Sequence, residues 1–198
     1  ANTVAFTDDG LIGYNTDGYG FVTALQESFG TQVKGDRIFI LGCGGAGRAT
    51  ALLAAREGAS SIVLADLDGD RMERLASEIY AQAPSVGVDQ VQGREAQVEA
   101  CYGCDLVVQA SPVGMKREDE SLLPSAAFHA NQRVFDLIYM YPETAIMSVA
   151  REAGAAVANG LGMLLHQGAR AFTIWTEEEP DVDVMRRSLE EAVYGSGE

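Results

Sequence analysis

Basic side chains are scarce in this sequence. Lysine and arginine together number 14 against 29 aspartates and glutamates, which gives a formal net charge of −15 at pH 7. Nucleic-acid phosphates and anionic membrane surfaces both attract a positively charged face, so this balance argues against either as a partner. We interpret the acidic stretch 177–191 as a solvated surface that favours solubility.

Long hydrophobic runs are also missing. No run approaches the roughly 20 apolar residues of a membrane helix, and no basic segment followed by an apolar one marks a secretory signal. With 47% hydrophobic residues, the 198-residue chain is typical of a soluble globular protein of one domain, or one domain with an appendage. The first residue is Ala1 rather than methionine, so we expect sequence upstream of it.

Cysteine is rare as well, and its three positions are Cys43, Cys101 and Cys104. The C-x-x-C spacing of the last two suits redox or metal chemistry, but a zinc ion needs two more ligands, and the two histidines show no matching spacing. We therefore predict no metal site. The reducing cytoplasm is the expected compartment.

Glycine, in contrast, is abundant, and three glycines form the most informative motif. Gly42, Gly44 and Gly47 have G-x-G-x-x-G spacing directly after the apolar run 38–41. In this motif the first glycine permits a tight turn, the second lets the backbone approach a diphosphate, and the third lets the next helix pack closely on the strand. The pattern predicts a buried strand, a turn and a helix.

The surroundings of this motif favour dinucleotide binding over the alternative, a strand, turn and helix without a ligand. A helix is predicted over 46–56, and free N–H groups of Gly45 and Ala46 at its start suit phosphates. A second apolar run, 62–65, ends at Asp66, about 20 residues beyond the glycines. A carboxylate there accepts hydrogen bonds from ribose hydroxyls.

Strands and helices alternate through the rest of the chain. A hairpin is predicted over 1–14 with a turn at 8–10, and further strands at 86–91, 105–109, 133–137 and 155–157. Helices are predicted to follow the possible N-caps at 15–18 and 68–70, and over 95–102, 144–153, 161–175 and 182–194. The helix over 161–175 is expected to turn inward Leu164, Leu165, Ala169, Phe172 and Trp175. This order predicts an α/β fold with a doubly wound, mainly parallel sheet of the Rossmann type, whose ligands bind beyond the carboxyl ends of the strands.

Several motifs, taken together, resemble the shikimate/quinate dehydrogenase family. They are Asn-Thr at 2–3, G-Y-N-T-D-G-Y-G-F at 13–21, the glycine-rich turn at 42–49, A-S-P-V-G-M at 110–115, D-L-I-Y at 136–139 and N-G-L-G-M-L…Q at 159–167. Members of that family are two-lobed. The resemblance implies that residues 1–35 are a hinge hairpin and helix of the interlobe region. Residues 36–198 are then the dinucleotide-binding domain, with C-terminal helices that return to the hinge, and the amino-terminal substrate lobe is absent.

This resemblance implies reversible hydride transfer between a nicotinamide and a shikimate- or quinate-type ring alcohol or 3-dehydro ketone. Asp17 matches the catalytic aspartate, which shares the substrate proton with a lysine, and it also belongs to the substrate site. Asn2 and Gln167 match residues that bind substrate hydroxyls, and Tyr139 matches a tyrosine of the substrate cleft. The residues that match cofactor positions outside the glycine-rich unit are Ser111, Leu137 and Gly160.

The bare sequence leaves other interpretations open for three of these residues. Asp17 also suits the N-cap of the following helix, and the two roles can coexist. Gln167 can be an ordinary solvated glutamine on a helix surface. The ring of Tyr139 can be an apolar packing contact whose hydroxyl faces solvent.

Two features depart from the family pattern. Lys34 and Lys116 are the only lysines, and neither lies in the family's lysine motif. We therefore expect the chain alone to bind dinucleotide with little or no turnover, and a non-enzymatic NAD-binding regulatory module is the alternative function. The second departure is Gln109, which stands where asparagine is common.

The residues after the second strand bear on the cofactor. NADP-dependent members commonly carry Asn-Arg-Thr there, whereas this chain has Asp66-Leu67-Asp68. A carboxylate favours a free ribose 2′-hydroxyl and repels a 2′-phosphate, so we predict NAD over NADP. Arg71 lies near enough in sequence to reach a phosphate, which keeps NADP as the alternative. The expected partner is a small-molecule substrate of the shikimate or quinate type, and a homodimer is left open.

Overall fold

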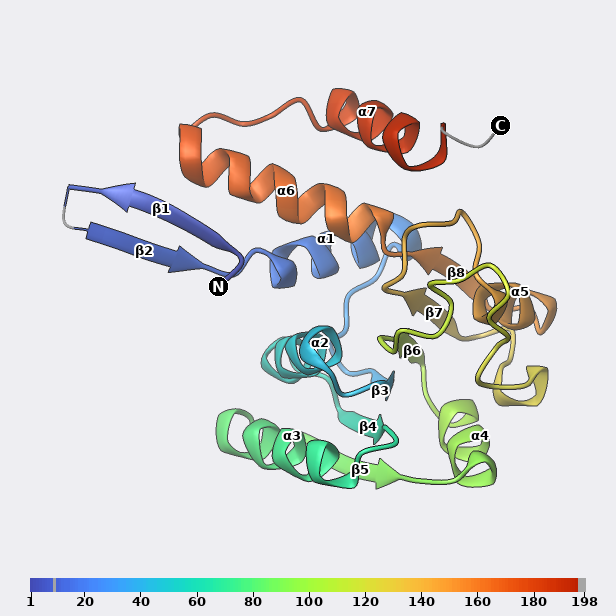
Figure 1. Cartoon of the computed structure of the whole chain (residues 1–198). Coiled ribbons are helices and arrows are strands. Elements are labelled where there is room, and N and C mark those ends of the chain that lie inside the picture. The colour runs from blue at the N-terminus through green and yellow to red at the C-terminus, as the bar shows by residue number, and fades with distance from the viewer. Residues whose placement is uncertain (9, 196–198) are drawn as a thin grey trace.

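The computed structural model describes residues 1–8 and 10–195 of the chain, shown in Figure 1. Its strands are β1 (Thr3–Thr7), β2 (Gly10–Tyr14), β3 (Arg37–Leu41), β4 (Ser61–Ala65), β5 (Gly87–Val91), β6 (Leu106–Gln109), β7 (Arg133–Asp136) and β8 (Ala156–Asn159). Its helices are α1 (Asp17–Phe29), α2 (Gly45–Arg56), α3 (Gly69–Gln82), α4 (Arg94–Tyr102), the short 3₁₀ helix η1 (Ser125–Ala127), α5 (Ala145–Glu152), α6 (Leu161–Thr176) and α7 (Val182–Tyr194). The strand and helix order confirms the predicted α/β alternation.

Six strands form one parallel sheet in the order β5-β4-β3-β6-β7-β8. The chain adds β4 and β5 on one side of β3, and then returns to add β6, β7 and β8 on the other side. The strand order therefore reverses between β3 and β6, and a doubly wound sheet binds its ligands in the crevice at such a point. The predicted fold class is confirmed.

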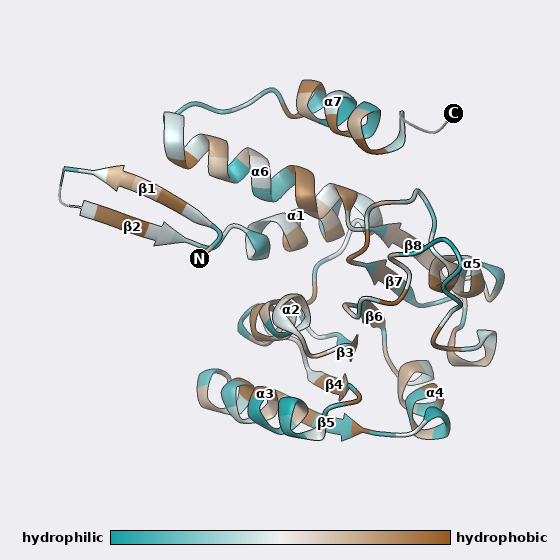
Figure 2. Cartoon of the chain, in the orientation of Figure 1, coloured by the Kyte–Doolittle hydropathy of each residue, from teal (hydrophilic) through white to brown (hydrophobic). Residues whose placement is uncertain are grey.

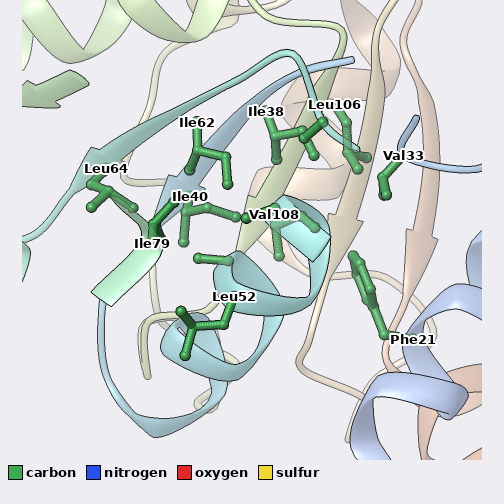
Figure 3. Close-up of a cluster of buried hydrophobic side chains, with 14 of the residues drawn as sticks. Phe21, Val33, Ile38, Ile40, Leu52, Ile62, Leu64, Ile79, Leu106 and Val108 are labelled. Atoms are coloured by element: carbon green, nitrogen blue, oxygen red, sulfur yellow. The ribbon is translucent and has the colours of Figure 1, made fainter. Parts of the chain in front are cut away.

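Alternate residues of the central strands pack on opposite faces of this sheet. On one face Ile38 and Ile40 join the buried side chains of α1, α2 and α3, and Figure 3 shows part of this cluster. On the other face Phe39 and Leu41 join the side chains of α4, η1 and α5. Because both faces are covered, β3 is apolar and buried from Ile38 to Leu41, as its sequence indicated.

The hairpin of β1 and β2 extends away from the sheet, and α6 runs beside α1 with α7 above it (Figure 1). Hydrophobic residues colour both hairpin strands in Figure 2, and among them Phe6 and Leu11 are 87% and 68% exposed. Asp9, in the predicted turn of the hairpin, lies outside the described residues. Gly30 is the C-cap of α1; it takes the left-handed conformation with φ 69° and donates its N–H to the Gln26 carbonyl.

The predicted inward face of α6 is wrong at its C-terminal end. Leu165 and Ala169 are buried, but Phe172 and Trp175 are 38% and 60% exposed. The last turns of α6 lie beside the hairpin rather than the sheet, so less of the chain covers them (Figure 1). The Trp175 indole N–H instead donates to the main-chain oxygen of Val4 at 2.9 Å. Within the described residues, no helix is both long enough and apolar enough to span a membrane.

Candidate functional site

The turn after β3 has the geometry that its glycines predict. Gly42 has a φ of 101°, which favours glycine, and a Cβ there would lie 2.7 Å from the main-chain nitrogen of Ser111. A Cβ on Gly47 would lie 1.8 Å from the Gly42 carbonyl oxygen, so α2 packs directly on the turn. These two glycines are therefore required by the fold itself.

Gly44 is different, because a Cβ there would meet no protein atom within 4 Å, and the same holds for Gly45. Gly44 is the N-cap of α2 and supplies no side-chain capping bond. The first N–H groups of the helix, including those of Gly45 and Ala46, accordingly lack the intrahelical acceptors that later residues have. The open space beside Gly44 fits a group that approaches the backbone from outside, and a diphosphate suits these N–H donors.

Asp66 follows β4, and its side chain, only 9% exposed, turns back toward this turn. Its Oδ2 accepts the Cys43 main-chain N–H at 2.6 Å, and its Oδ1 accepts the Asp68 N–H at 2.9 Å. Burial raises the pKa of the Asp66 carboxyl, but these two N–H donors and the Arg71 guanidinium outweigh burial and hold the pKa below its ordinary value. The carboxylate is thus ionised at neutral pH.

Arg71 lies on α3 and faces two carboxylates. Its Nη1 is 3.4 Å from Asp66 Oδ2, and its Nη2 is 3.5 Å from Asp68 Oδ2. Leu67, between the two aspartates, is fully exposed. The positive charge nearest Asp66 is therefore already partly neutralised by acidic neighbours.

A cavity of about 440 Å³ opens beside these residues. Five of the predicted cofactor residues line it: Gly42, Gly44, Asp66, Arg71 and Ser111. Its remaining walls come from the apolar runs and motifs named above, with two additions that the sequence analysis did not single out, Gln97 and Leu122. Leu122 and Gln97 come from a loop and a helix with no motif, so their place in the wall depends on the path of the folded chain.

A second group of predicted residues meets where the hairpin, α1 and α6 join. The Asn2 Nδ2 donates to Asp17 Oδ1 at 2.8 Å, and the Asn2 Oδ1 accepts the Thr16 N–H at 3.0 Å. Thr16 Oγ1 in turn donates to Gln167 Oε1 at 3.2 Å. The structure therefore brings Asn2, Asp17 and Gln167 together around Thr16, a residue of the N-T-D motif that was not predicted as a site residue.

Asp17 is the first residue of α1 and not its N-cap, so the capping interpretation is wrong. Thr16 holds the N-cap position without a side-chain capping bond. The Asp17 carboxylate is instead bound by Asn2 across the hairpin. Gln167 is half-buried and bonded to Thr16, which is unlike a freely solvated glutamine.

The close approach of α1 and α6 explains how Gln167 reaches the N-T-D motif. A Cβ on Gly20 would lie 2.5 Å from the Met163 carbonyl oxygen and 2.9 Å from the Gln167 Cβ. Only glycine at this position of α1 leaves room for the backbone of α6. The second Gly of the D-G-x-G pattern thus has a packing role.

Leu137, Tyr139 and Gly160 lie at the carboxyl ends of β7 and β8, outside the lining of the 440 Å³ cavity. The Gly160 N–H donates to the Ile138 carbonyl oxygen at 3.1 Å, so the two strand ends are tied together. Tyr139 is half-buried in the same loop. These three residues belong to the neighbouring part of the sheet edge.

Asp136 holds the start of that loop, and sequence analysis did not single out its carboxylate. It is fully buried, accepts the Thr144 hydroxyl at 2.6 Å and accepts the Ile138 N–H at 3.0 Å. Burial raises the pKa of Asp136 to about 6, although both donors oppose the shift. The D-x-x-Y spacing in the sequence was the available signal.

Cys101 and Cys104 lie at the end of α4 and just beyond it, and both are buried and unpaired thiols. Burial raises the pKa of both, to about 11 for Cys104, which disfavours the reactive thiolate. Within residues 1–8 and 10–195, no group of three or more His, Cys, Asp or Glu side chains is arranged to hold a metal ion.

Two family models match parts of the chain. Residues 160–190 match the Shikimate 5'-dehydrogenase C-terminal domain, and residues 38–119 match the Saccharopine dehydrogenase NADP binding domain. The second match spans the glycine-rich turn, Asp66 and the loop after β6. It therefore covers most of the cavity's lining.

Curated relatives match over nearly the whole chain. A shikimate dehydrogenase (NADP(+)) of Methanopyrus kandleri is 43% identical over 194 residues, which cover 95% of this chain and 66% of that protein. One of Bacillus cereus is 36% identical over 195 residues, which cover 98% of this chain and 69% of that protein. The chain thus spans about two thirds of the length of the curated relatives it matches.

Solved structures of a shikimate and a quinate dehydrogenase are also similar to this chain. The shikimate 5-dehydrogenase of Listeria monocytogenes, in complex with shikimate and NAD, superposes with a TM-score of 0.85 at 32% identity, over 94% of this chain and 66% of that one. The quinate dehydrogenase of Corynebacterium glutamicum, in complex with NAD, gives a TM-score of 0.83 at 30% identity, over 93% of this chain and 65% of that one.

Proposed function

Since the chain belongs to the shikimate dehydrogenase family, we propose that it is the dinucleotide-binding part of an NAD(P)-dependent shikimate or quinate dehydrogenase. One observation carries this proposal. The turn at Gly44 and the Asp66 side chain line the same cavity, at the point where the strand order of the sheet reverses. An open backbone with free N–H groups suits a diphosphate, and an ionised carboxylate beside it suits the adjoining ribose.

The residues at the turn would bind and orient the dinucleotide. The N–H groups at the start of α2, from Gly45 to Gly47, are the donors for the diphosphate oxygens. Ser111 also lines the cavity, and its main chain packs against the turn at Gly42. Leu137 and Gly160, at the next strand ends, are the proposed contacts of the nicotinamide end.

We propose a preference for NAD over NADP. Asp66 is ionised and Leu67 offers no positive charge, so a 2′-phosphate would meet carboxylates where NADP users place an arginine. Among the residues that the structure describes, Arg71 is the one cation in the cavity lining, and both Asp66 and Asp68 already engage it. The matched curated relatives are named for NADP(+), whereas the Listeria and Corynebacterium structures were solved with NAD.

The nicotinamide, when bound, supplies or accepts the hydride. We propose that Asp17 holds the proton that leaves or joins the substrate oxygen. Asn2 binds Asp17 Oδ1, which fixes the orientation of the carboxylate. Asn2, Tyr139 and Gln167 are the proposed partners of the substrate hydroxyls, because amide and phenol groups can donate and accept hydrogen bonds.

The domain assignment follows the same logic. We propose that residues 1–35 form the hinge hairpin and helix of the interlobe region and that residues 36–198 form the dinucleotide-binding domain. The contact of α1 with α6 supports a return of the C-terminal helices to this hinge, as does the bond from Trp175 to Val4.

Calorimetric titration of the chain with NAD and with NADP tests the proposal. We expect NAD to bind at least about tenfold more tightly, since a hydrogen bond to a charged group contributes roughly 1.5–3 kcal/mol. Absence of heat with either nucleotide contradicts dinucleotide binding, and equal affinities contradict the NAD preference alone.

A non-enzymatic NAD-binding module is the second candidate function, because neither lysine of this chain lies in the family's lysine motif. Within the described residues neither Lys34 nor Lys116 makes a hydrogen bond or ion pair with Asp17. We expect the isolated chain to show no turnover of shikimate or quinate. Turnover by a longer parent protein that supplies a lysine supports the enzyme, and NAD binding without turnover there supports the module.

A further inference from the structure

Gln109 is the last residue of β6, only 1% exposed, and it precedes the loop Ala110–Val113. We propose that Gln109 is a positioning residue that sets dinucleotide affinity by holding this loop as one wall of the cavity. The inference rests on the proposed dinucleotide binding and assigns a role to a residue that departs from the family's usual asparagine.

Every hydrogen-bonding group of the Gln109 amide is directed at this loop. The Nε2 donates to the Val113 carbonyl oxygen at 2.7 Å and to the Ser111 carbonyl oxygen at 3.1 Å. The Oε1 accepts the Ser111 N–H at 2.9 Å. The amide therefore uses both of its donor hydrogens and its acceptor to fold one short segment.

That segment borders the site directly. Ala110, Ser111, Pro112 and Val113 all line the 440 Å³ cavity, and they follow β6, on the other side of β3 from β4 and Asp66. The backbone of Ser111 also packs against the glycine-rich turn, since a Cβ on Gly42 would lie 2.7 Å from the Ser111 nitrogen. Loss of the Gln109 bonds would therefore loosen a cavity wall and the support of the turn together.

Gln132 provides a matched control within the same chain. It is also 1% exposed, and its Nε2 donates to the Cys101 and Cys104 carbonyl oxygens at 2.7 and 2.9 Å. Its Oε1 accepts the His129 N–H at 2.9 Å. Gln132 precedes β7, at the amino end of the sheet, and none of its partners lines the cavity.

The two glutamines thus make the same number of side-chain hydrogen bonds to main-chain groups, and only the partners of Gln109 line the cavity. We expect Gln109→Leu and Gln132→Leu to lower the thermal midpoint by similar amounts. For folded protein titrated with NAD, Gln109→Leu should raise Kd at least about tenfold, whereas Gln132→Leu should leave Kd within about twofold of the wild type.

An unchanged Kd for Gln109→Leu, or an equal rise for both variants, overturns the inference. If Gln109→Leu does not fold, Gln109→Asn replaces it, because it keeps an amide but draws the nitrogen back by one methylene. We expect at least about a threefold rise in Kd for Gln109→Asn, and wild-type affinity there overturns the inference. Failure of the wild-type chain to bind NAD overturns the proposed function as well, so the two failures are distinguishable.

Discussion

The main-chain N–H of Cys43 donates to Asp66 Oδ2 at 2.6 Å, and this bond ties the glycine-rich turn to the carboxylate at the end of the next strand. The two residues are 23 positions apart and lie just beyond the carboxyl ends of the neighbouring parallel strands β3 and β4. The acid proposed to select the ribose therefore also shapes the turn proposed to hold the diphosphate. A substitution of Asp66 should reveal both effects.

We predict that Asp66→Asn reduces the preference for NAD over NADP by about tenfold. The asparagine keeps an oxygen that can accept the Cys43 N–H, but it removes the charge that repels a 2′-phosphate. Titration of the variant with both nucleotides measures the ratio. Asp70→Asn, in the first turn of α3 and outside the cavity lining, makes the same change in net charge. An equal shift in both variants would attribute the preference to overall charge instead.

Alanine at two positions of the glycine motif should separate binding from folding. Gly44→Ala places a methyl in open space, so we expect stability to change by less than about 1 kcal/mol while NAD affinity falls at least about tenfold. Gly47→Ala drives a methyl against the Gly42 carbonyl, and overpacking of this kind costs about 1–3 kcal/mol or more.

Denaturant unfolding and NAD titration, run on both variants, provide the comparison. If Gly44→Ala binds NAD as tightly as the wild type, the space beside Gly44 is not where a ligand approaches. If Gly47→Ala is as stable as the wild type, the contact between α2 and the turn adjusts more easily than its distance indicates.

These glycines also show what the sequence could predict. Their spacing, and the apolar run before them, predicted the turn, the parallel strand and the start of α2, because backbone conformation and burial impose local patterns. Asp66 was predicted near the turn because the carboxyl ends of parallel strands meet at one edge of a sheet. The bond to the Cys43 N–H was not predicted, since it depends on how far the side chain turns back.

Other features were beyond the reach of a local pattern. The amide contacts of Gln109 depend on the path of a loop, and Thr16 meets Gln167 only because α1 and α6 pack closely. The exposure of Phe172 and Trp175 has a similar cause. Helical periodicity identifies one face of α6, but it does not tell where the neighbouring elements end.

Asp136 should make stability depend on pH between about pH 4 and pH 6. Burial raises its pKa from 3.8 to about 6, so in this window the folded state binds more protons than the unfolded state. This group's contribution to stability therefore falls as pH rises through the window and stays at its lower value above about pH 6. We expect the contribution to be about 1 kcal/mol smaller at pH 7.5 than at pH 5.

Denaturant unfolding of the wild type and Asp136→Asn at both pH values isolates this effect. The variant should gain about 1 kcal/mol relative to the wild type between pH 5 and pH 7.5. Asp119→Asn is the control, because hydrogen bonds from the Gly114 and Lys116 N–H groups lower the pKa of Asp119 below its ordinary value. Asp119 therefore titrates below this window, and its variant should differ from the wild type by the same amount at pH 5 and pH 7.5. The same stability difference at pH 5 and pH 7.5 for Asp136→Asn would show that this carboxyl titrates near its ordinary value.

The Trp175 indole N–H bonds the hairpin to α6. Loss of this bond should destabilise the hairpin and leave the rest of the fold unchanged. Trp175→Phe keeps an aromatic ring but loses the bond to the Val4 carbonyl. We expect amides of β1 and β2 to exchange with deuterium about two- to tenfold faster, because a hydrogen bond contributes roughly 0.5–1.5 kcal/mol. Global stability should change by less than about 0.5 kcal/mol, as at other exposed positions. Phe172→Leu, a substitution at an exposed aromatic residue of α6 for which no side-chain hydrogen bond is possible, is the control. Equal exchange in both variants would mean that packing, and not the Trp175 bond, holds the proposed hinge.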